Sequence, residues 1–193
     1  MRGLRILLFL FFLFSLAGCW DREELENLGL VLAMGIDSLP NREVEVTVQV
    51  AIPIRLGPGG GGGGGAAGGE KGPPTQVVTK KAKTVPEAFR AINRTLSRRI
   101  TLAQNRLLVF GEETARKGLA PYLVLFVRYR EFRRTMQIAV VKGRAKEILS
   151  LQPELEKNPT ECLLDLIRQA RHTGGTDLVT VNEFLRAMTQ HGS

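Results

Sequence analysis

The strongest structural signal in the chain is the segment EVEVTVQVAI (Glu43–Ile52). Valine or isoleucine recurs at alternate positions, and the positions up to Gln49 between them carry Glu, Thr or Gln. Successive side chains of a strand point to opposite faces, so this period predicts a half-buried strand with one polar face. The apolar run Leu28–Ile36 precedes it, and Asp37–Arg42 has the composition of a turn. Together they predict a β-hairpin.

Outward from this hairpin, strands and helices alternate. Pro53 ends the predicted strand, and residues 57–74 read as a flexible glycine-rich insertion. Further strands are predicted at Thr75–Lys83, Arg106–Phe110 and Thr135–Val141, and helices at 84–96, 111–118, 120–129, 145–151, 158–171 and from 180 onward. Two of these helices begin with a capping box, Thr84–Glu87 and Thr180–Glu183. The interleaving predicts an α+β fold with a mixed, largely antiparallel sheet on which helices pack.

Composition narrows the kinds of chemistry that the chain can perform. The 193 residues include two cysteines and two histidines, too few for a disulfide-rich scaffold or a Cys-only zinc site. Eleven of the 21 glycines lie between Gly57 and Gly72, and no Gly-Lys-Ser/Thr sequence closes that tract, so a phosphate-binding loop is disfavoured. No nucleophile or acid/base set is recognisable. We therefore expect no metal, no catalytic site and no enzymatic activity.

The N-terminus has the pattern of an export signal. Arg2 and Arg5 precede the apolar run Ile6–Phe14, and the sequence Leu16-Ala17-Gly18-Cys19 follows. These four residues resemble a bacterial lipobox, which predicts cleavage after residue 18 and a diacylglyceryl group on Cys19. An uncleaved membrane anchor is the alternative, but the apolar stretch is shorter than the roughly 20 residues needed to span a bilayer. Cys162 then has no partner within the chain and is expected to be a small buried apolar residue.

Positive charge is concentrated in one part of the sequence. Between Lys80 and Arg144 there are 16 Lys or Arg residues and four acidic residues, a local net charge of +12, compared with +8 for the whole chain. This concentration is compatible with three interpretations: a solvated basic face with internal ion pairs, attraction to anionic lipid headgroups or an acidic partner, and nucleic-acid binding. Export across a membrane argues against nucleic acid as a partner.

Several motifs together resemble the Ger(x)C family, the lipoprotein subunit of nutrient germinant receptors in endospore-forming bacteria. They begin with Cys19-Trp20-Asp21-Arg22 and continue with Gly35-Ile36-Asp37, Gly111-Glu112-Glu113 and the set Arg128, Glu131 and Arg133. The resemblance implies a non-enzymatic subunit, lipid-anchored on the extracytoplasmic face of the spore inner membrane, that associates with integral membrane receptor subunits. The resemblance implies no cofactor other than the covalent lipid on Cys19.

The resemblance also sets expectations for domains and sites. Residues 1–18 correspond to the signal peptide and 19–193 to the family's N-terminal domain, whereas a C-terminal domain of the family is absent from the sequence. Arg128, Glu131 and Arg133 follow a predicted apolar helix and are candidates either for partner contact or for structural ion pairs. Two further interpretations remain open: a generic extracytoplasmic lipoprotein that binds a small ligand, and a truncated, non-functional receptor subunit.

Overall fold

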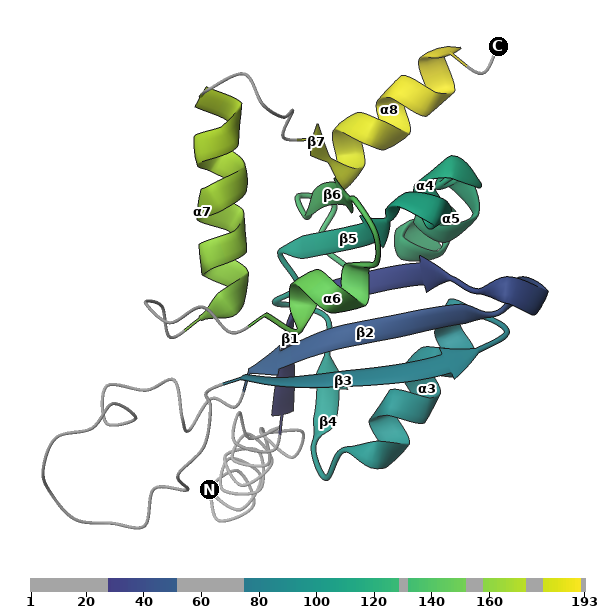
Figure 1. The fold of residues 1–193 in the computed structure, drawn as a ribbon, viewed down its shortest axis with the longest axis vertical. Helices are drawn as coiled ribbons and strands as arrows, with labels where there is room; N and C mark the ends of the chain where they lie inside the picture. The colour runs from purple at the N-terminus through teal and green to yellow at the C-terminus, as the bar shows by residue number, and fades with distance from the viewer. Residues whose placement is uncertain (1–27, 52–74, 129–131, 152–157, 173–178, 192–193) are drawn as a thin grey trace, which may run out of the picture.

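The computed structural model describes residues 28–51, 75–128, 132–151, 158–172 and 179–191 (Figure 1). The predicted signal peptide, Cys19, the glycine-rich insertion at 57–74 and Glu131 lie outside the described residues. The strands are β1 (Leu28–Ser38), β2 (Val44–Ala51), β3 (Thr75–Ala82), β4 (Arg99–Thr101), β5 (Leu107–Gly111), β6 (Gln137–Val141) and β7 (Val179–Thr180). The helices are the 3-10 turn η2 (Pro40–Arg42), α3 (Val85–Thr95), α4 (Glu112–Arg116), α5 (Ala120–Arg128), α6 (Ala145–Leu149), α7 (Pro159–His172) and α8 (Val181–His191).

The described strands form one mixed sheet in the order β3-β2-β1-β5-β6-β7, and β4 pairs with the beginning of β1. The hairpin of β1 and β2 and the pairs β2–β3 and β6–β7 are antiparallel. The pairs β1–β4, β1–β5 and β5–β6 are parallel. The predicted α+β class and mixed sheet are confirmed. Within the described residues three strand pairs are of each kind, but the antiparallel pairs hold 18 residue pairs and the parallel pairs 12, so antiparallel pairing is the larger part of the sheet, as expected.

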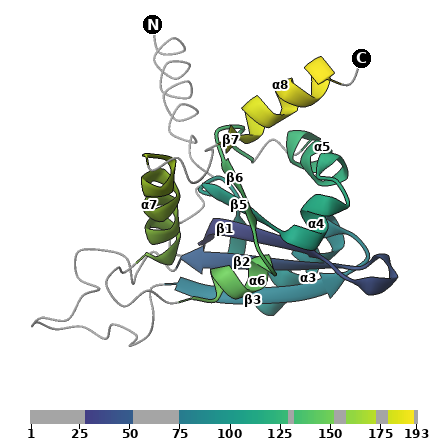
Figure 2. The same ribbon diagram turned by 45° about the horizontal axis from the view of Figure 1, so that its top comes forward.

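Helices cover both faces of the sheet (Figures 1 and 2). On one face, Val46, Val48 and Phe110 belong to a core that includes residues of α3 and α5, with side chains of α8 packed against it. On the other face, Ala33 and Val109 belong to a second core with residues of α6 and α7.

The prediction that β2 is half-buried is wrong, because every residue from Val44 to Ala51 is buried. The reason is that α6 and the beginning of α7 lie over its polar side.

Both predicted capping boxes lie at the beginnings of helices. At α8, the Thr180 hydroxyl accepts a hydrogen bond from the Glu183 N–H (3.2 Å), and the Glu183 carboxylate accepts one from the Thr180 N–H (2.8 Å). At α3, the Thr84 hydroxyl accepts from the Glu87 N–H (3.3 Å), but the Glu87 carboxylate accepts from the N–H of Lys83, one residue earlier than expected (3.2 Å). Each box satisfies backbone donors that the first helical turn leaves without partners.

Other local differences from the sequence prediction are small. The strands β4 and β7 have three and two residues, too few for a periodic signal. Helix α3 ends at Thr95, one residue before the predicted end of the helix at 84–96, and Arg98 lies in the turn before β4. Cys162 is a free thiol on α7 and is half-buried, where full burial was expected.

Candidate functional site

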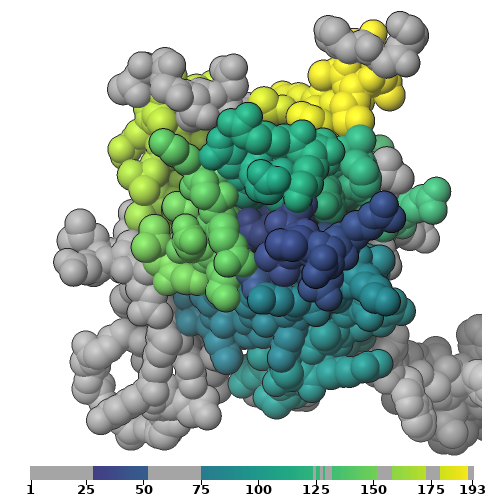
Figure 3. All heavy atoms as spheres, turned by 45° about the vertical axis from the view of Figure 1, so that its right-hand side comes forward, coloured from purple at the N-terminus to yellow at the C-terminus, as the bar shows by residue number. Residues whose placement is uncertain are grey.

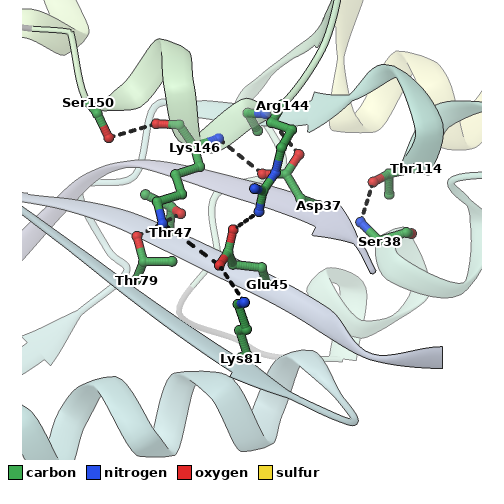
Figure 4. Close-up of polar contacts among 11 residues, drawn as sticks. Asp37, Ser38, Glu45, Thr47, Thr79, Lys81, Thr114, Arg144, Lys146 and Ser150 are labelled. Carbon is green, nitrogen blue, oxygen red and sulfur yellow. Dashed lines mark hydrogen bonds and ion pairs between the residues drawn. The ribbon is translucent and has the colours of Figure 1, made fainter. Parts of the chain in front are cut away.

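The buried carboxylate of Asp37 connects the end of β1 to the beginning of α6 (Figure 4). Its Oδ1 accepts a hydrogen bond from the N–H of Ala145 (2.8 Å), and its Oδ2 accepts one from the N–H of Lys146 (3.0 Å). Arg144 occupies the N-cap position of α6 but makes no side-chain capping bond. Asp37 therefore supplies from another element the anionic cap that the helix sequence itself lacks.

Two glycines allow the backbone to approach this junction closely. A Cβ atom at Gly111 would lie 2.2 Å from the Asp37 Oδ1 and 2.9 Å from the carbonyl oxygen of Gly143. A Cβ atom at Gly35 would lie 2.9 Å from a methyl carbon of Leu149 on α6. The motifs Gly35-Ile36-Asp37 and Gly111-Glu112-Glu113, which are far apart in the sequence, therefore meet at one point of the fold. Their glycines are required there because no side chain fits.

A second buried carboxylate, Glu45, lies beside Asp37 in the hairpin register. Its side chain is 2% exposed and forms ion pairs with Arg144, with Lys146 at 3.9 Å and with Lys81 at 4.0 Å. These cations come from β3 and from the beginning of α6, so Glu45 joins three elements at one carboxylate (Figure 4). A buried carboxylate needs such partners, because its removal from water is unfavourable.

The polar row of β2 continues from Glu45 with hydrogen-bonded neutral side chains. Thr47 and Thr79 share a hydroxyl–hydroxyl hydrogen bond of 3.0 Å between β2 and β3. The Gln49 side-chain amide donates to the carbonyl oxygen of Leu149 (3.3 Å) and accepts from the hydroxyl of Thr160 at the beginning of α7. We call the set Asp37, Glu45, Thr47 and Gln49 with these partners the polar junction. It holds α6 and α7 against the sheet by directional contacts.

The polar junction is an internal connection. As whole residues, Asp37 and Glu45 are 3% and 1% exposed. The Asp37 carboxylate is bonded to backbone N–H groups, and the Glu45 carboxylate is paired with cationic side chains. On the face drawn in Figure 3, residues of the β1–β2 hairpin lie between those of α6 and those of β3 and α3. We therefore assign Asp37 and Glu45 to the stability of the fold.

Exposed carboxylates occupy the first turns of two helices. On α4, Glu112 pairs with Arg116 at 2.7 Å; this hydrogen bond and the charge of Arg116 lower the pKa of Glu112, and the same pair raises the pKa of Arg116. On α8, hydrogen bonds from the backbone and hydroxyl of Thr180 lower the pKa of Glu183. These groups remain charged at neutral pH and stabilise their helix ends.

An apolar groove of about 430 Å³ opens between α3, β4 and the end of α5. Its walls include Phe89, Ile100, Phe126 and Phe132, and Arg90, Asn93 and Arg99 also line it. Phe126 and Phe132 pack edge to face with their ring centroids 4.5 Å apart. The groove could accept the apolar part of a small molecule, with cationic groups available to a negatively charged part.

The structure separates the site residues predicted from the sequence. Leu16, Ala17, Gly18, Cys19 and Glu131 lie outside the described residues. Arg128 is the last residue of α5 and is exposed. Arg133 is exposed in the turn before β6, where its carbonyl oxygen accepts a hydrogen bond from the Met136 N–H (3.1 Å). The proposed pairing of these arginines with Glu131 remains a prediction.

In the described part of the chain, no group of three or more His, Cys, Asp or Glu side chains is arranged to hold a metal ion. Among the helices of the described ranges, none combines the length and hydrophobicity needed to cross a bilayer.

The polar junction is not evident from the sequence. The sequence places Asp37 in a turn and Glu45 in a solvent-facing row, because the partners of both at the beginning of α6 lie about 100 residues further along the chain. The available signal was the Gly-Ile-Asp sequence at the end of a strand, which the family resemblance identified without explaining it.

Comparison with known proteins relates the chain to spore germination proteins. Residues 21–193 match the family described as the spore germination protein N-terminal domain. The chain is 31% identical over 179 residues to YfkR of Bacillus subtilis (strain 168), covering 92% of this chain and 44% of YfkR. From the same organism, spore germination protein A3 is 28% identical over 194 residues (98% of this chain, 49% of that protein), and spore germination protein KC is 33% identical over 148 residues (75% and 35%).

The chain spans less than half the length of these three curated relatives. No solved structure matches it.

Proposed function

Because the chain belongs to the family described as the spore germination protein N-terminal domain, we propose that it acts in spore germination, as the lipid-anchored subunit of a nutrient germinant receptor. The observation that carries this proposal is the family match over residues 21–193, together with relatives named spore germination proteins A3 and KC. The lipobox-like sequence Leu16–Cys19 lies one residue before the matched region.

Membrane anchoring is the first part of the proposal. A diacylglyceryl group on Cys19 supplies two acyl chains, and each buried methylene contributes about 0.8 kcal/mol to membrane binding. Two chains hold a protein stably where a single chain is marginal. Export places the folded domain on the extracytoplasmic face, which in a spore is the outer surface of the inner membrane.

Non-enzymatic association is the second part. The sequence offers no recognisable nucleophile or acid/base set, and the buried carboxylates Asp37 and Glu45 are bonded to backbone N–H groups and cations. Exposed Arg128 and Arg133 lie at the end of α5 and in the turn after it, where they are available for contact with integral membrane receptor subunits. The proposed role is therefore assembly with those subunits.

Spores that carry cysteine variants test the proposal directly. The host is an endospore-forming bacterium whose own copy of the gene is deleted. Three versions of the gene are placed at the native locus, each with the coding sequence that follows it: the unsubstituted gene, Cys19→Ala and Cys162→Ala. Release of dipicolinic acid after nutrient addition reports germination. We expect Cys19→Ala to lose the response, whereas Cys162→Ala, the matched control at a half-buried thiol, retains it. A full nutrient response in spores that lack the gene would refute the germination role.

Small-ligand binding is a second candidate function, and the apolar groove between α3 and α5 is the observation that favours it. A bound amphipathic anion would raise the melting temperature by mass action. Thermal unfolding of the chain with a set of small carboxylates checks this. A ligand-dependent rise that Phe89→Ala abolishes would support it, and unchanged melting with every compound would count against it.

A further inference from the structure

The apolar groove between α3, β4 and the end of α5 has walls that are only half-buried. Phe89 of α3, Leu125 of α5 and Phe132 before β6 pack against the core and yet keep part of their surface exposed. Apolar side chains gathered around a groove are typical of a place where another segment or molecule binds. What covers this groove can be inferred from the chain that enters the fold beside it.

The chain enters the described fold at the edge of the groove. Leu28 and Gly29, the first residues of β1, pair in parallel register with Arg99 and Ile100 of β4. Arg99 and Ile100 both line the groove. Figure 1 shows the beginning of β1 beside β4 and the end of α3, with α8 at the opposite end of the molecule. The polypeptide that precedes Leu28 is therefore attached next to the groove.

The segment at 20–27, which immediately precedes β1, is acidic and contains two large apolar residues. The apolar residues are Trp20 and Leu25. One arginine and four acidic residues give the segment a net charge of −3, and the acidic residues are Asp21, Glu23, Glu24 and Glu26. A fully extended chain covers at most about 10 Å from Leu28 to Leu25 and about 28 Å from Leu28 to Trp20. Both apolar side chains are thus within reach of the groove.

The elements beside the groove have the opposite charge. Between Ala88 and Thr101 the sequence contains no acidic residue and four arginines, which are Arg90, Arg94, Arg98 and Arg99. Arg90 and Arg99 line the groove, and Arg94 is exposed one turn further along α3. The charges of −3 and +4 nearly cancel. Complementary charge of this kind favours association and fixes its register.

Two further observations favour this segment over a separate partner. The family match begins at residue 21, so the matched domain includes residues 21–27. The segment is also covalently attached beside the groove, which gives it an effective concentration on the order of millimolar. A separate ligand would have to compete with it.

We propose that residues 20–27 dock in the apolar groove. Trp20 and Leu25 cover its apolar walls, and the acidic side chains pair with the arginines of α3 and β4. The inference goes beyond the proposed function and does not require lipidation. In the lipid-anchored form, docking binds the residue next to Cys19 to the domain, so the groove end is held at the bilayer surface without an intervening flexible tether.

Disulfide crosslinking in the full chain tests the docking. Every form carries Cys162→Ser and is oxidised in isolated membranes. Leu25→Cys is combined with Phe89→Cys or with Leu125→Cys, which are two positions of the groove wall. The matched control combines Leu25→Cys with Thr189→Cys, an exposed position on α8. All forms are also prepared with Cys19→Ala, which separates docking from the anchor.

Charge reversal in the Leu25→Cys/Leu125→Cys chain tests the pairing of the segment with α3. Arg90→Glu with Arg94→Glu should weaken docking, and adding Glu23→Arg with Glu24→Arg should restore it. Arg171→Glu with Arg186→Glu, at exposed positions of α7 and α8, is the control for charge alone. Circular dichroism melts of the reduced forms verify that every variant is folded.

We expect the groove pairs to crosslink about tenfold faster than the control pair or more. Reversal of Arg90 and Arg94 should slow crosslinking about fivefold, the compensating reversal should restore it, and the control reversal should leave it unchanged. The same rates in the Cys19→Ala form support docking even if the anchor fails. Equal rates for the groove and control pairs in folded chains overturn the inference. A rise in melting temperature with small carboxylates that is as large in the crosslinked chain as in the reduced chain also overturns it, in favour of a small ligand as the occupant.

Discussion

The substitution Asp37→Ala tests whether the cap at the beginning of α6 stabilises the fold. It removes the acceptor of two backbone N–H groups, those of Ala145 and Lys146. An interior N–H left without a partner costs about 1–3 kcal/mol, and loss of an N-cap costs about 0.5–2 kcal/mol. The two N–H groups together give a range of about 2–6 kcal/mol. Because the substitution also relieves the burial of a charge, we expect the lower part of this range, about 2–4 kcal/mol.

Thermal and urea unfolding followed by circular dichroism measure this effect. For a domain of this size, 1 kcal/mol corresponds to about 2–4 °C in Tm, so Asp37→Ala should lower Tm by about 4–16 °C. The matched control is Asp165→Ala, which removes a half-exposed carboxylate that pairs with Arg168 on α7. Exposed pairs of this kind contribute less than about 1 kcal/mol. Equal effects of the two substitutions would refute the assignment of Asp37 as a tertiary cap.

The remaining predictions concern the neighbouring glycine, an exposed cap and the candidate contact residues. Gly111→Ala places a Cβ 2.2 Å from a carboxylate oxygen of Asp37, so we expect a loss of about 2 kcal/mol or more in urea titration; an unchanged midpoint would contradict the close approach. The pKa of Glu183 is lowered by its capping bonds, so its stabilisation is present above its ordinary pKa and lost as the pH falls through the lowered value. Acidification should therefore destabilise the unsubstituted chain more than Glu183→Gln, and parallel pH profiles would count against the cap. Arg128→Ala and Arg133→Ala should leave lipidation and the melt intact but weaken co-purification with the membrane subunits; a reduced melting temperature would indicate structural ion pairs.

Local features of the fold were well predicted because their causes lie within a few residues. The Thr180–Glu183 capping box determines where α8 begins, and both of its bonds are present. The alternation of Val44, Val46, Val48 and Val50 correctly predicted a strand and its apolar face. The acidic beginning and the closing glycine of the segment 111–118 likewise predicted α4.

Long-range contacts were not predictable from periodicity. The same alternation predicted that Glu45 and Gln49 face solvent, but Arg144 and Thr160 contact them from 99 and 111 residues further along the chain. Nothing local to β2 indicates that α6 covers its polar side. A polar row in a strand is compatible either with solvent or with a polar junction, and only the packing of later helices decides between them.

The proposed membrane anchor depends on one chemical event, the lipidation of Cys19. Mass spectrometry of the mature N-terminal peptide measures that event directly. The account predicts that the mature chain begins at Cys19 and that this residue carries a diacylglyceryl group. An unmodified Cys19, or cleavage at another position, would contradict it.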